Sequence, residues 1–314
     1  MYRTGYCCIN LSLDENFRTM QLTWANKNPE EAPKKWREVV THNFKLLHKI
    51  IEWNLKNGVF LYRISSDLIP FADHDQWGQL WREALRAEWM AEASSPARQA
   101  LTNYRTLGGR LTIHPGQFVS ISSPNDETRR KSLANLEYHG QLLDYLGLPE
   151  SVECPINIHI SNGTKGEQVV KYVEQSLSLM SASVRNRLVF ENEQNGYWKP
   201  SNIKKHFKVP ITLDYHHLSI NPDEGFTLEE IIKFTRDSWP NIDPVQHYSE
   251  GRKHALDPAH SDYVQSLPDQ PYDIEIEAKM IATSMNNKQL DHVIEEMLKN
   301  EYVRQAFWTP STSE

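Results

Sequence analysis

Six short apolar runs of this sequence end in side chains that can bind a metal ion or carry a proton. They are LTIHPG with His114, INIHIS with His159, LVFENE with Glu191, ITLDYHH with Asp214 and His217, VQHYSE with His247, and IEIEAK with Glu277. Such runs are typical of buried strands, so the first polar residue beyond each is expected at the carboxyl end of a strand. One such residue commonly just hydrogen-bonds a loop, but the whole set indicates a shared site.

These residue types indicate a particular chemistry. Histidine nitrogens combined with carboxylate oxygens suit Zn²⁺, Mn²⁺ or Fe²⁺, whereas sites for Mg²⁺ and Ca²⁺ are built mostly from oxygen. A carboxylate such as Glu191 can bridge two ions, and ions about 3.5–4 Å apart can stabilise both the attacking and the leaving oxygen of an in-line displacement. Hydrolysis of a phosphodiester is the reaction that this arrangement favours.

Further histidines lie close to this set in the sequence. The spacing Asp214-x-x-His217 lets one segment serve two adjacent metals, and His216 between them is expected to face away. His260 ends a loop that is long enough to fold over the site, and His254 in the same loop is the alternative ligand.

The elements that must position these residues read as alternating strands and helices. The strand candidates are residues 3–9, 57–64, 109–114, 154–160, 187–191, 210–214, 243–248 and 272–277, and the helix candidates are 34–55, 76–107 with a break at Ser94-Ser95-Pro96, 127–146, 167–183 and 227–238. Residues 18–33 are expected to form a loop. The pattern predicts an α/β fold, a single (β/α)₈ TIM barrel with the metal site at the carboxyl ends of its strands.

No linker divides the chain, so one barrel domain is expected over residues 1–300. A helix at 290–298 and a partly disordered tail at 301–314 would follow. No apolar run approaches the ~20 residues of a spanning helix, and no signal peptide is evident, so we expect a cytoplasmic protein without a membrane partner.

The bulk composition indicates neither a disordered nor a membrane protein. The 314 residues are 39% hydrophobic and 24% charged, which is ordinary for a globular protein. The net charge of −7 by itself disfavours binding to nucleic acid. A cleft that holds metal ions supplies local positive charge that this sum leaves out.

Several longer motifs resemble those of the UV damage endonucleases (UvdE/UvsE type), which are relatives of endonuclease IV. They are GYCCIN at 5–10, YRISSDLIPFADH at 62–74, RLTIHPGQFV at 110–119, INIHISNG at 156–163, RLVFENE at 187–193, ITLDYHH at 211–217, HYSEGR at 247–252 and IEIEAK at 274–279. The resemblance implies a monomeric DNA repair enzyme, associated with the nucleoid during repair. It would incise damaged double-stranded DNA on the 5′ side of cyclobutane pyrimidine dimers and 6-4 photoproducts, with activity at abasic sites left open.

The resemblance also implies two or three divalent ions, Mn²⁺ first, with Zn²⁺ or Mg²⁺ as alternatives. The first ion would be held by His114, His159 and a bridging, catalytic Glu191, and the second by Asp214, His247 and Glu277. His217 and His260 would hold the third. Many family members have a Lys two residues before the strand-seven histidine, where this chain has Val245, so occupancy of the third site is left open.

The remaining implied residues concern the phosphate and the lesion. His74 would be a catalytic residue near the phosphate. Gln117 and Phe118 match a family pair, usually Gln with Tyr, that inserts into the gap left by flipped nucleotides; the alternative for Phe118 is a place in the core. Tyr6 and Asn10 would line the lesion pocket. The cationic side chains expected to contact phosphates are Arg63 and Arg252.

Two other functions stay open at this point. A metal-dependent sugar isomerase also places Glu, Asp and His around two metals in a barrel. The other alternative is a catalytically inactive barrel that binds damaged DNA. It is favoured only if loss of the third metal, caused by valine at position 245, abolishes turnover.

Overall fold

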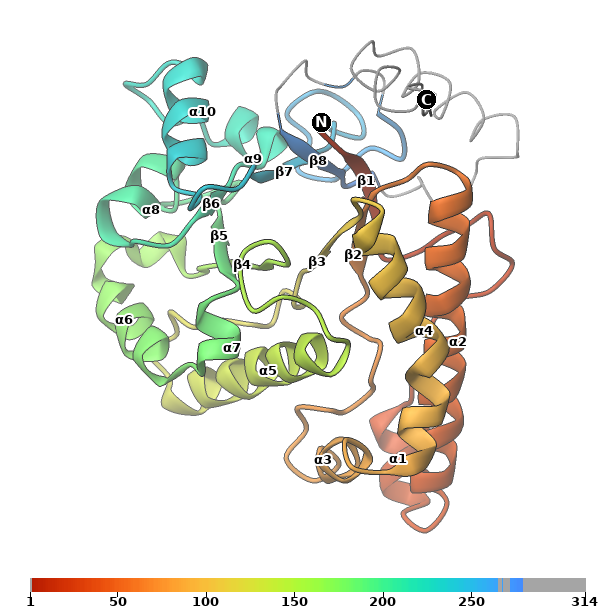
Figure 1. Ribbon diagram of the computed structural model, residues 1–314. Coiled ribbons are helices and arrows are strands. Elements are labelled where there is room, and N and C mark those ends of the chain that lie inside the picture. The colour runs from red at the N-terminus through yellow and green to blue at the C-terminus, as the bar shows by residue number, and fades with distance from the viewer. Residues whose placement is uncertain (1, 265–266, 268–271, 279–314) are drawn as a thin grey trace, which may run out of the picture.

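Eight short parallel strands form a ring at the centre of the fold (Figure 1). The structure, a computed structural model, describes residues 2–264, 267 and 272–278. The strands are β1 (Thr4–Cys7), β2 (Leu61–Ile64), β3 (Arg110–Ile113), β4 (Ile156–His159), β5 (Leu188–Glu191), β6 (Ile211–Thr212), β7 (Val245–Tyr248) and β8 (Asp273–Ile276). The predicted (β/α)₈ barrel is therefore confirmed.

The ring closes at two of the residues singled out in the sequence. Strands β1 to β6 pair in sequence order, and β8 pairs with both β1 and β7. Between β6 and β7 the contact is an isolated parallel bridge that joins Asp214 to His247, with the amide of His247 donating to the carbonyl of Leu213 at 2.9 Å. The closing seam of the barrel thus fixes the relative position of Asp214 and His247.

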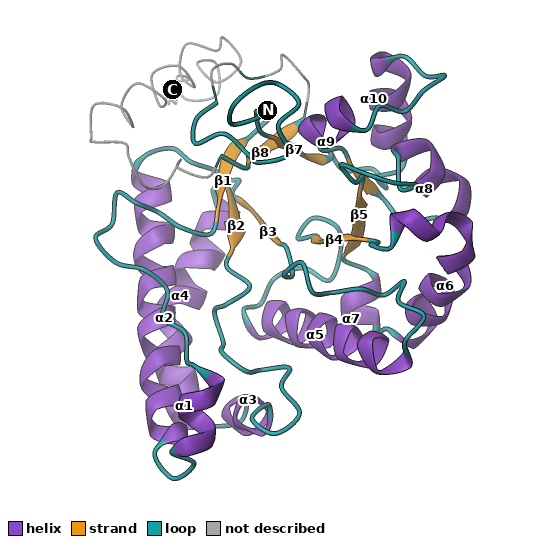
Figure 2. Ribbon diagram, turned by 180° about the vertical axis from the view of Figure 1, so that it is seen from behind, coloured by secondary structure: helices purple, strands orange, loops and turns teal. Residues whose placement is uncertain are grey.

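Helices cover the outside of the ring (Figure 2). They are α1 (Leu22–Lys27), α2 (Ala32–Lys56), α3 (Gln79–Ala84), α4 (Glu88–Thr106), α5 (Asp126–Tyr145), the 3₁₀ helix η1 (Gly163–Val169), α6 (Val170–Leu179), α7 (Ala182–Arg185), α8 (Pro200–His206), α9 (Tyr215–Ile220) and α10 (Leu228–Asp237). In the described part of the chain, none of them combines the length and apolar character that a membrane-spanning helix needs.

Helix α2 is much longer than the strands it connects. Its 25 residues extend over roughly 37 Å, whereas a four-residue strand covers about 13 Å. Because α2 runs antiparallel to β1 and β2, its Lys56 end lies at the amino end of the barrel and its Ala32 end lies beyond the carboxyl ends of the strands. Helices α2 and α4 therefore stand together as a wall beside the mouth of the barrel (Figure 1).

Two expectations about this wall were wrong. Residues 18–33 are not a continuous loop, because α1 forms within them and α2 already begins at Ala32. The break at Ser94-Ser95-Pro96 is absent, and α4 runs through Pro96. A proline inside a helix removes one hydrogen bond, and the burial of Met90, Ala97 and Leu101 along one face of α4 outweighs this loss.

The remaining sequence predictions differ only in detail or are not tested. Strand β2 begins only at Leu61, later than the predicted 57–64, because a turn at Asn57 and Gly58 follows α2. The short helices α8 and α9 were not foreseen. The predicted helix at 290–298 and the tail at 301–314 lie outside the described residues, so the domain division at residue 300 stays a prediction.

Candidate metal centre

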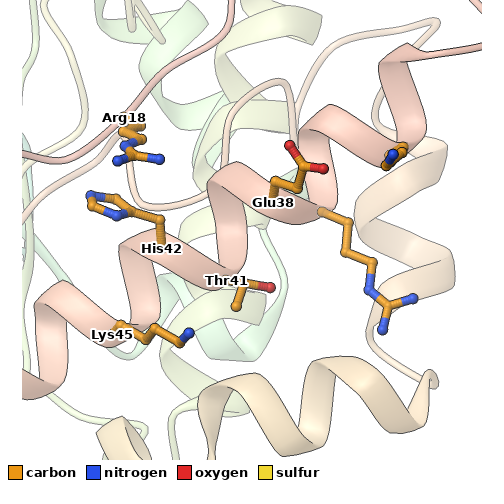
Figure 3. Close-up of a pocket in the computed structure, with 7 residues that line it drawn as sticks. Arg18, Glu38, Thr41, His42 and Lys45 are labelled. Atoms are coloured by element: carbon orange, nitrogen blue, oxygen red, sulfur yellow. The ribbon is translucent and has the colours of Figure 1, made fainter.

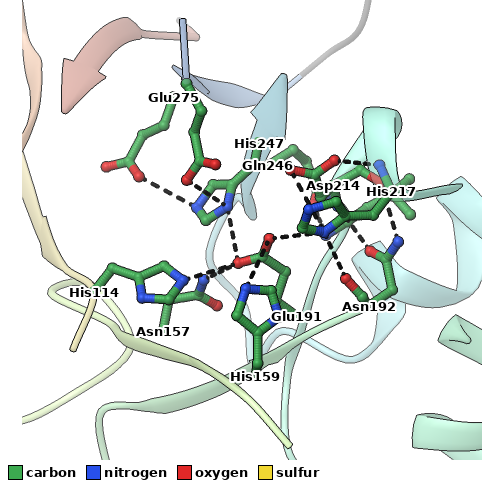
Figure 4. A network of polar contacts seen from close by, with 12 residues as sticks. His114, Asn157, His159, Glu191, Asn192, Asp214, His217, Gln246, His247 and Glu275 are labelled. Atoms are coloured by element: carbon green, nitrogen blue, oxygen red, sulfur yellow. Dashed lines mark hydrogen bonds and ion pairs between the residues drawn. The ribbon is translucent and has the colours of Figure 1, made fainter. Parts of the chain in front are cut away.

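Glu191, the last residue of β5, is fully buried and surrounded by imidazoles (Figure 4). Its carboxylate oxygens lie 3.0 Å from Nδ1 of His247, 3.2 Å from Nδ1 of His217 and 3.3 Å from Nε2 of His114. Nε2 of His159 is 3.8 Å away. Burial by itself would raise the pKa of Glu191, but the imidazoles of His247 and His159 bring it well below its usual range, so the carboxylate is ionised.

Two clusters of ligand atoms meet at Glu191. One consists of His114, His159 and Glu191, and the other of Glu191, Asp214, His247 and Glu277; within each cluster the ligand atoms lie within 4.8 Å of one another. Their membership coincides with the two ligand sets that the sequence suggested. Glu191 is the residue common to both, as a bridging carboxylate would be.

The chemistry of the site fits divalent cations. Four carboxylates, those of Glu191, Asp214, Glu275 and Glu277, are gathered at one end of the barrel, and Arg63 pairs with the last two. In the described chain, the buried atoms Asp214 Oδ2 and His247 Nδ1 make no hydrogen bond. Mixed imidazole and carboxylate donors of this kind suit Mn²⁺, Zn²⁺ or Fe²⁺.

Helix α9 holds His217 beside Asp214. Asp214 caps this helix by accepting a hydrogen bond from the amide of His217 at 2.7 Å. The Nδ1 of His217 is 2.9 Å from the carbonyl of Asn192. Because a carbonyl only accepts, Nδ1 carries the proton, and Nε2 is left as the nitrogen available to a metal.

The proposed third site is less complete in the structure. The ring of His260 lies 6.1 Å from that of His217, but His260 belongs to neither described ligand cluster. Val245 is buried among Leu61, Val152, Val189 and Trp239 and offers no ligand atom. His216 is held by the carbonyl of Asp257 at 2.9 Å. Occupancy of a third site stays a prediction.

Arg63 does not lie where a phosphate contact was expected. It is buried inside the barrel, where Nε and Nη2 donate to Glu275 Oε2 at 2.8 and 2.6 Å and Nη1 contacts Glu277. A guanidinium engaged in this way holds Glu275 and Glu277 in place and is not exposed at the surface.

Tyr6 and Asn10 are also placed away from the site. Both are buried, with Asn10 Nδ2 donating to the Tyr6 hydroxyl at 2.7 Å and that hydroxyl donating to Asn54 of α2 at 2.8 Å. In this conformation they lie between the barrel and α2, and their part in a lesion pocket stays a prediction. His74 lies in the loop after β2, where its Nδ1 accepts from the amides of Gln76 and Trp77 at 3.2 and 3.3 Å, outside both ligand clusters.

Gln117 and Phe118 are exposed at the rim of the site. Phe118 is 87% exposed, so its alternative place in the core was wrong. Gln117 borders a cavity of about 360 Å³ that reaches His114, His159 and His217. Arg252 is exposed as well, and its Nε donates to the carbonyl of His260 at 3.2 Å.

Sequence reasoning missed several residues that touch the ligands. Asn157 donates to Glu191, and Glu275 contacts both Arg63 and His247. Alternation along IEIE already places positions 275 and 277 on the same side of β8, which is the signal that could have found Glu275. Glu193 lines the cavity, and burial raises its pKa to about 7.

Comparison with known proteins agrees with this geometry. Residues 2–299 match the family described as UV-endonuclease UvdE. The chain belongs to the UvdE family. Its relatives include a UV-damage endonuclease of Schizosaccharomyces pombe, 30% identical over 306 residues, which cover 88% of this chain and 48% of that protein. A UV DNA damage endonuclease of Nostoc sp. is 28% identical over 287 residues, with 88% of this chain and 85% of that protein covered.

This UvdE family member thus spans about half the length of the first relative and most of the second. The crystal structure of SacUVDE has a TM-score of 0.78 at 24% identity, covering 96% of this chain and 99% of that one. Endonuclease IV from Thermus thermophilus (TM-score 0.52, 15% identity, 97% and 98% covered) and a D-psicose 3-epimerase (0.51, 11%, 96% and 99%) share the barrel as well. At these identities the likeness shows the fold alone.

Metal binding should stabilise this UvdE protein measurably. An ion present at 100 times its Kd adds about 2.7 kcal/mol to the free energy of unfolding, which raises Tm by roughly 4 °C for a domain of this size. We expect Mn²⁺ to produce this shift in chelator-treated protein, measured by differential scanning calorimetry. Glu191→Gln should lose most of it, because one charge shared by both clusters is removed.

The matched control is Glu229→Gln, which changes an exposed carboxylate on α10. This variant should keep the full Mn²⁺-dependent shift. A shift of equal size in Glu191→Gln would contradict the assignment of the clusters as metal sites.

Proposed function

We propose that this protein is a metal-dependent endonuclease of DNA repair that cuts damaged duplex DNA on the 5′ side of UV photoproducts. The observation that supports this most directly is the pair of ligand clusters sharing Glu191, found in a chain of the UvdE family. Two or three ions would be bound, Mn²⁺ first, with Zn²⁺ or Mg²⁺ as alternatives. The enzyme would act as a monomer on cyclobutane dimers and 6-4 photoproducts, with abasic sites as a further substrate to be tested.

The residues of the site would divide the chemistry between them. Divalent ions supply, when bound, the Lewis acidity that an in-line displacement at phosphorus needs. Glu191 holds the two clusters at a fixed separation, and the seam between β6 and β7 keeps Asp214 beside His247. A phosphodiester would reach the ligands through the cavity bordered by Gln117. His74 would act on the phosphate from the loop after β2.

Phe118 would discriminate damaged from intact DNA. It stands exposed on a loop whose neighbours Gly116 and Val119 line two adjoining cavities. A lesion that already weakens base stacking lowers the energy needed to extrude nucleotides, and an inserted aromatic ring can stack in the gap.

A cationic groove on α2 would support the flanking duplex (Figure 3). This cavity of about 530 Å³ is lined by Arg18, Lys34, Arg37, Glu38, Thr41, His42 and Lys45. In the described chain, its Arg and Lys side chains have no carboxylate partner, and the groove lies on the part of α2 that extends beyond the barrel mouth. Arg18 adjoins Thr19, which lines the cavity next to Phe118. These cations are better placed for phosphates than the buried Arg63.

The two alternatives from the sequence predict different outcomes. The barrel alone does not exclude a sugar isomerase, because an epimerase has the same fold. Membership in the UvdE family favours the endonuclease. A damage-binding barrel without activity would bind metal and lesion but not cut, and the following experiment separates it from the endonuclease.

Incision should require both the lesion and a metal. An end-labelled duplex with one cyclobutane dimer should be cut immediately 5′ of the dimer with Mn²⁺, and left intact with EDTA. Glu191→Gln should cut about 10³-fold more slowly, the order lost when a main electrostatic contributor is removed. The controls are an undamaged duplex and Glu229→Gln. Equal cutting of damaged and undamaged duplex would contradict the proposal, and binding without cutting would favour the inactive barrel.

Phe118→Ala should weaken recognition of the lesion. Loss of one base–aromatic stack costs about 1–3 kcal/mol, so affinity for the dimer-containing duplex should fall by roughly 5- to 150-fold. Affinity for Mn²⁺ should not change, since Phe118 belongs to neither ligand cluster. Phe118→Tyr is the matched control that keeps the ring. Binding is measured by fluorescence anisotropy. If Phe118→Ala still prefers the dimer-containing duplex over the undamaged duplex as strongly as the wild type does, Phe118 has no role in recognising the lesion.

Reversing charges in the groove should reduce the salt dependence of DNA binding. Each phosphate contact contributes about 0.9 to the slope of log K against log salt concentration. We expect Lys34→Glu with Lys45→Glu to reduce the slope by about 2 for damaged and undamaged duplex alike. Lys208→Glu, an exposed lysine just before β6 at the opposite end of the barrel, is the control. An unchanged slope would show that DNA does not reach the groove.

A further inference from the structure

His247 contacts the metal cluster on one side of its ring and a second carboxylate on the other. Its Nδ1 lies 3.0 Å from Glu191 and 3.3 Å from Glu277. Its Nε2 lies 3.3 Å from Oε2 of Glu275, which is fully buried. The imidazole therefore stands between the ligand cluster and a carboxylate that belongs to neither described cluster.

Three other histidines of the centre have a backbone carbonyl beside Nδ1, although Nδ1 of His217 also lies 3.2 Å from Glu191. The Nδ1 atoms of His114, His217 and His260 lie 2.8–2.9 Å from the backbone carbonyls of Pro115, Asn192 and Glu277. A carbonyl only accepts, so each of these contacts fixes the proton on Nδ1 and leaves Nε2 for a metal. In the described chain, Nδ1 of His247 makes no hydrogen bond with a carbonyl and faces Glu191, so the group that decides the position of its proton must lie at Nε2.

We propose that Glu275 is the positioning residue that holds His247 in its Nε2–H form, with the lone pair of Nδ1 directed at the ions shared with Glu191 and Glu277. This inference rests on the proposed metal dependence. A carboxylate on the far nitrogen of a ligating histidine fixes the ring and increases its basicity as a ligand.

Arg63 and Thr112 keep Glu275 in place for this role. Arg63 donates to Oε2 through Nε at 2.8 Å and Nη2 at 2.6 Å, and the Thr112 hydroxyl donates to Oε1. Arg63 also contacts Glu277. One guanidinium therefore holds both the proposed metal ligand Glu277 and Glu275, the carboxylate next to the proposed ligand His247. The carboxylate of Glu275 has no freedom to turn away from His247.

One contact offers the opposite tautomer. Nη2 of Arg63 lies 2.7 Å from Nε2 of His247. This contact is shorter than the 3.3 Å between Nε2 and Glu275, and a guanidinium only donates. A hydrogen bond from Arg63 would therefore need an unprotonated Nε2 and a proton on Nδ1, which could then not ligate a metal. The two arrangements differ in the position of a single proton, which an experiment can locate.

The first test measures metal affinity. Glu275→Gln keeps the shape of the side chain and removes its charge, and should weaken Mn²⁺ binding by about 10- to 100-fold in isothermal titration calorimetry, as loss of such a partner typically does. Asp273→Asn is the matched control. Asp273 is equally buried two residues earlier on β8 and pairs with Arg3 and Arg110, but it lies in neither ligand cluster.

Asp273→Asn should lower Tm while leaving the Kd for Mn²⁺ unchanged. If Glu275→Gln behaves in the same way, losing stability with an unchanged Kd, its role is structural and the proposal is overturned. Because this assay contains no DNA, its result is independent of incision. If the wild-type protein cuts the dimer duplex but Glu275→Gln binds Mn²⁺ as tightly as the wild type, the positioning role of Glu275 is overturned and the proposed endonuclease function is not.

The second test locates the proton. In ¹⁵N-histidine-labelled protein loaded with Zn²⁺, His247 should show a proton on Nε2 and a metal-shifted Nδ1, whereas His114 and His217 should show a proton on Nδ1. A proton on Nδ1 of His247 would overturn the proposal. Thr112→Val, which removes only the hydrogen bond to Oε1, should retain the wild-type tautomer and give a smaller loss of affinity than Glu275→Gln.

Discussion

Burial of four carboxylates at one end of a small barrel is the constraint on which the rest of the structure depends. Glu191, Asp214 and Glu275 are completely buried, and Glu277 is nearly so. Unpaired charges in a low-dielectric interior cost several kcal/mol each, so they persist only when cations and hydrogen bonds surround them. Arg63 supplies one positive charge, and the imidazoles around Glu191 contribute part of the rest. The remaining negative charge suits this end of the barrel to divalent ions.

Strand β8 shows how the barrel meets this constraint along its axis. Its buried residues Asp273 and Glu275 carry charge where a TIM barrel usually packs branched apolar side chains, and Glu277 follows just beyond the strand. Asp273 pairs with Arg3 and Arg110, and both Glu275 and Glu277 pair with Arg63. Because ion pairs of this kind add little net stability, the apolar contacts between the barrel and its helices must supply most of the stability. The side chains inside the barrel thus serve mainly to hold charged groups in fixed positions.

The sequence predicted which residues of the two clusters lie together, because each of them ends an apolar run and the carboxyl ends of parallel strands meet at one edge; their role as metal ligands stays a prediction. Glu191 and Asp214 follow that logic directly. The sequence failed where the direction of a side chain mattered. Arg63 was assigned to DNA because a cation at a strand end is usually exposed, but its position on β2 points it into the barrel, where it pairs with Glu275. Tyr6 was misplaced for the same reason, since it faces α2. Local patterns also underestimated tertiary packing, which carries α4 through Pro96.

The residues that would cut DNA are different from the residues that would recognise the lesion. Nothing in the two ligand clusters distinguishes one base from another, because imidazoles and carboxylates that hold ions act on the phosphodiester backbone common to all sequences. Discrimination must then come from the energy needed to bring a phosphate to the ions. Phe118 stands exposed beside the cavity that leads to them, and the wall of α2 rises on the same face of the barrel. A duplex that is already weakened by a lesion needs less free energy to bend over this rim than an intact one. Selectivity would then follow from the deformability of the DNA, because the metal centre is rigid and the DNA must change shape to bring a phosphate to it.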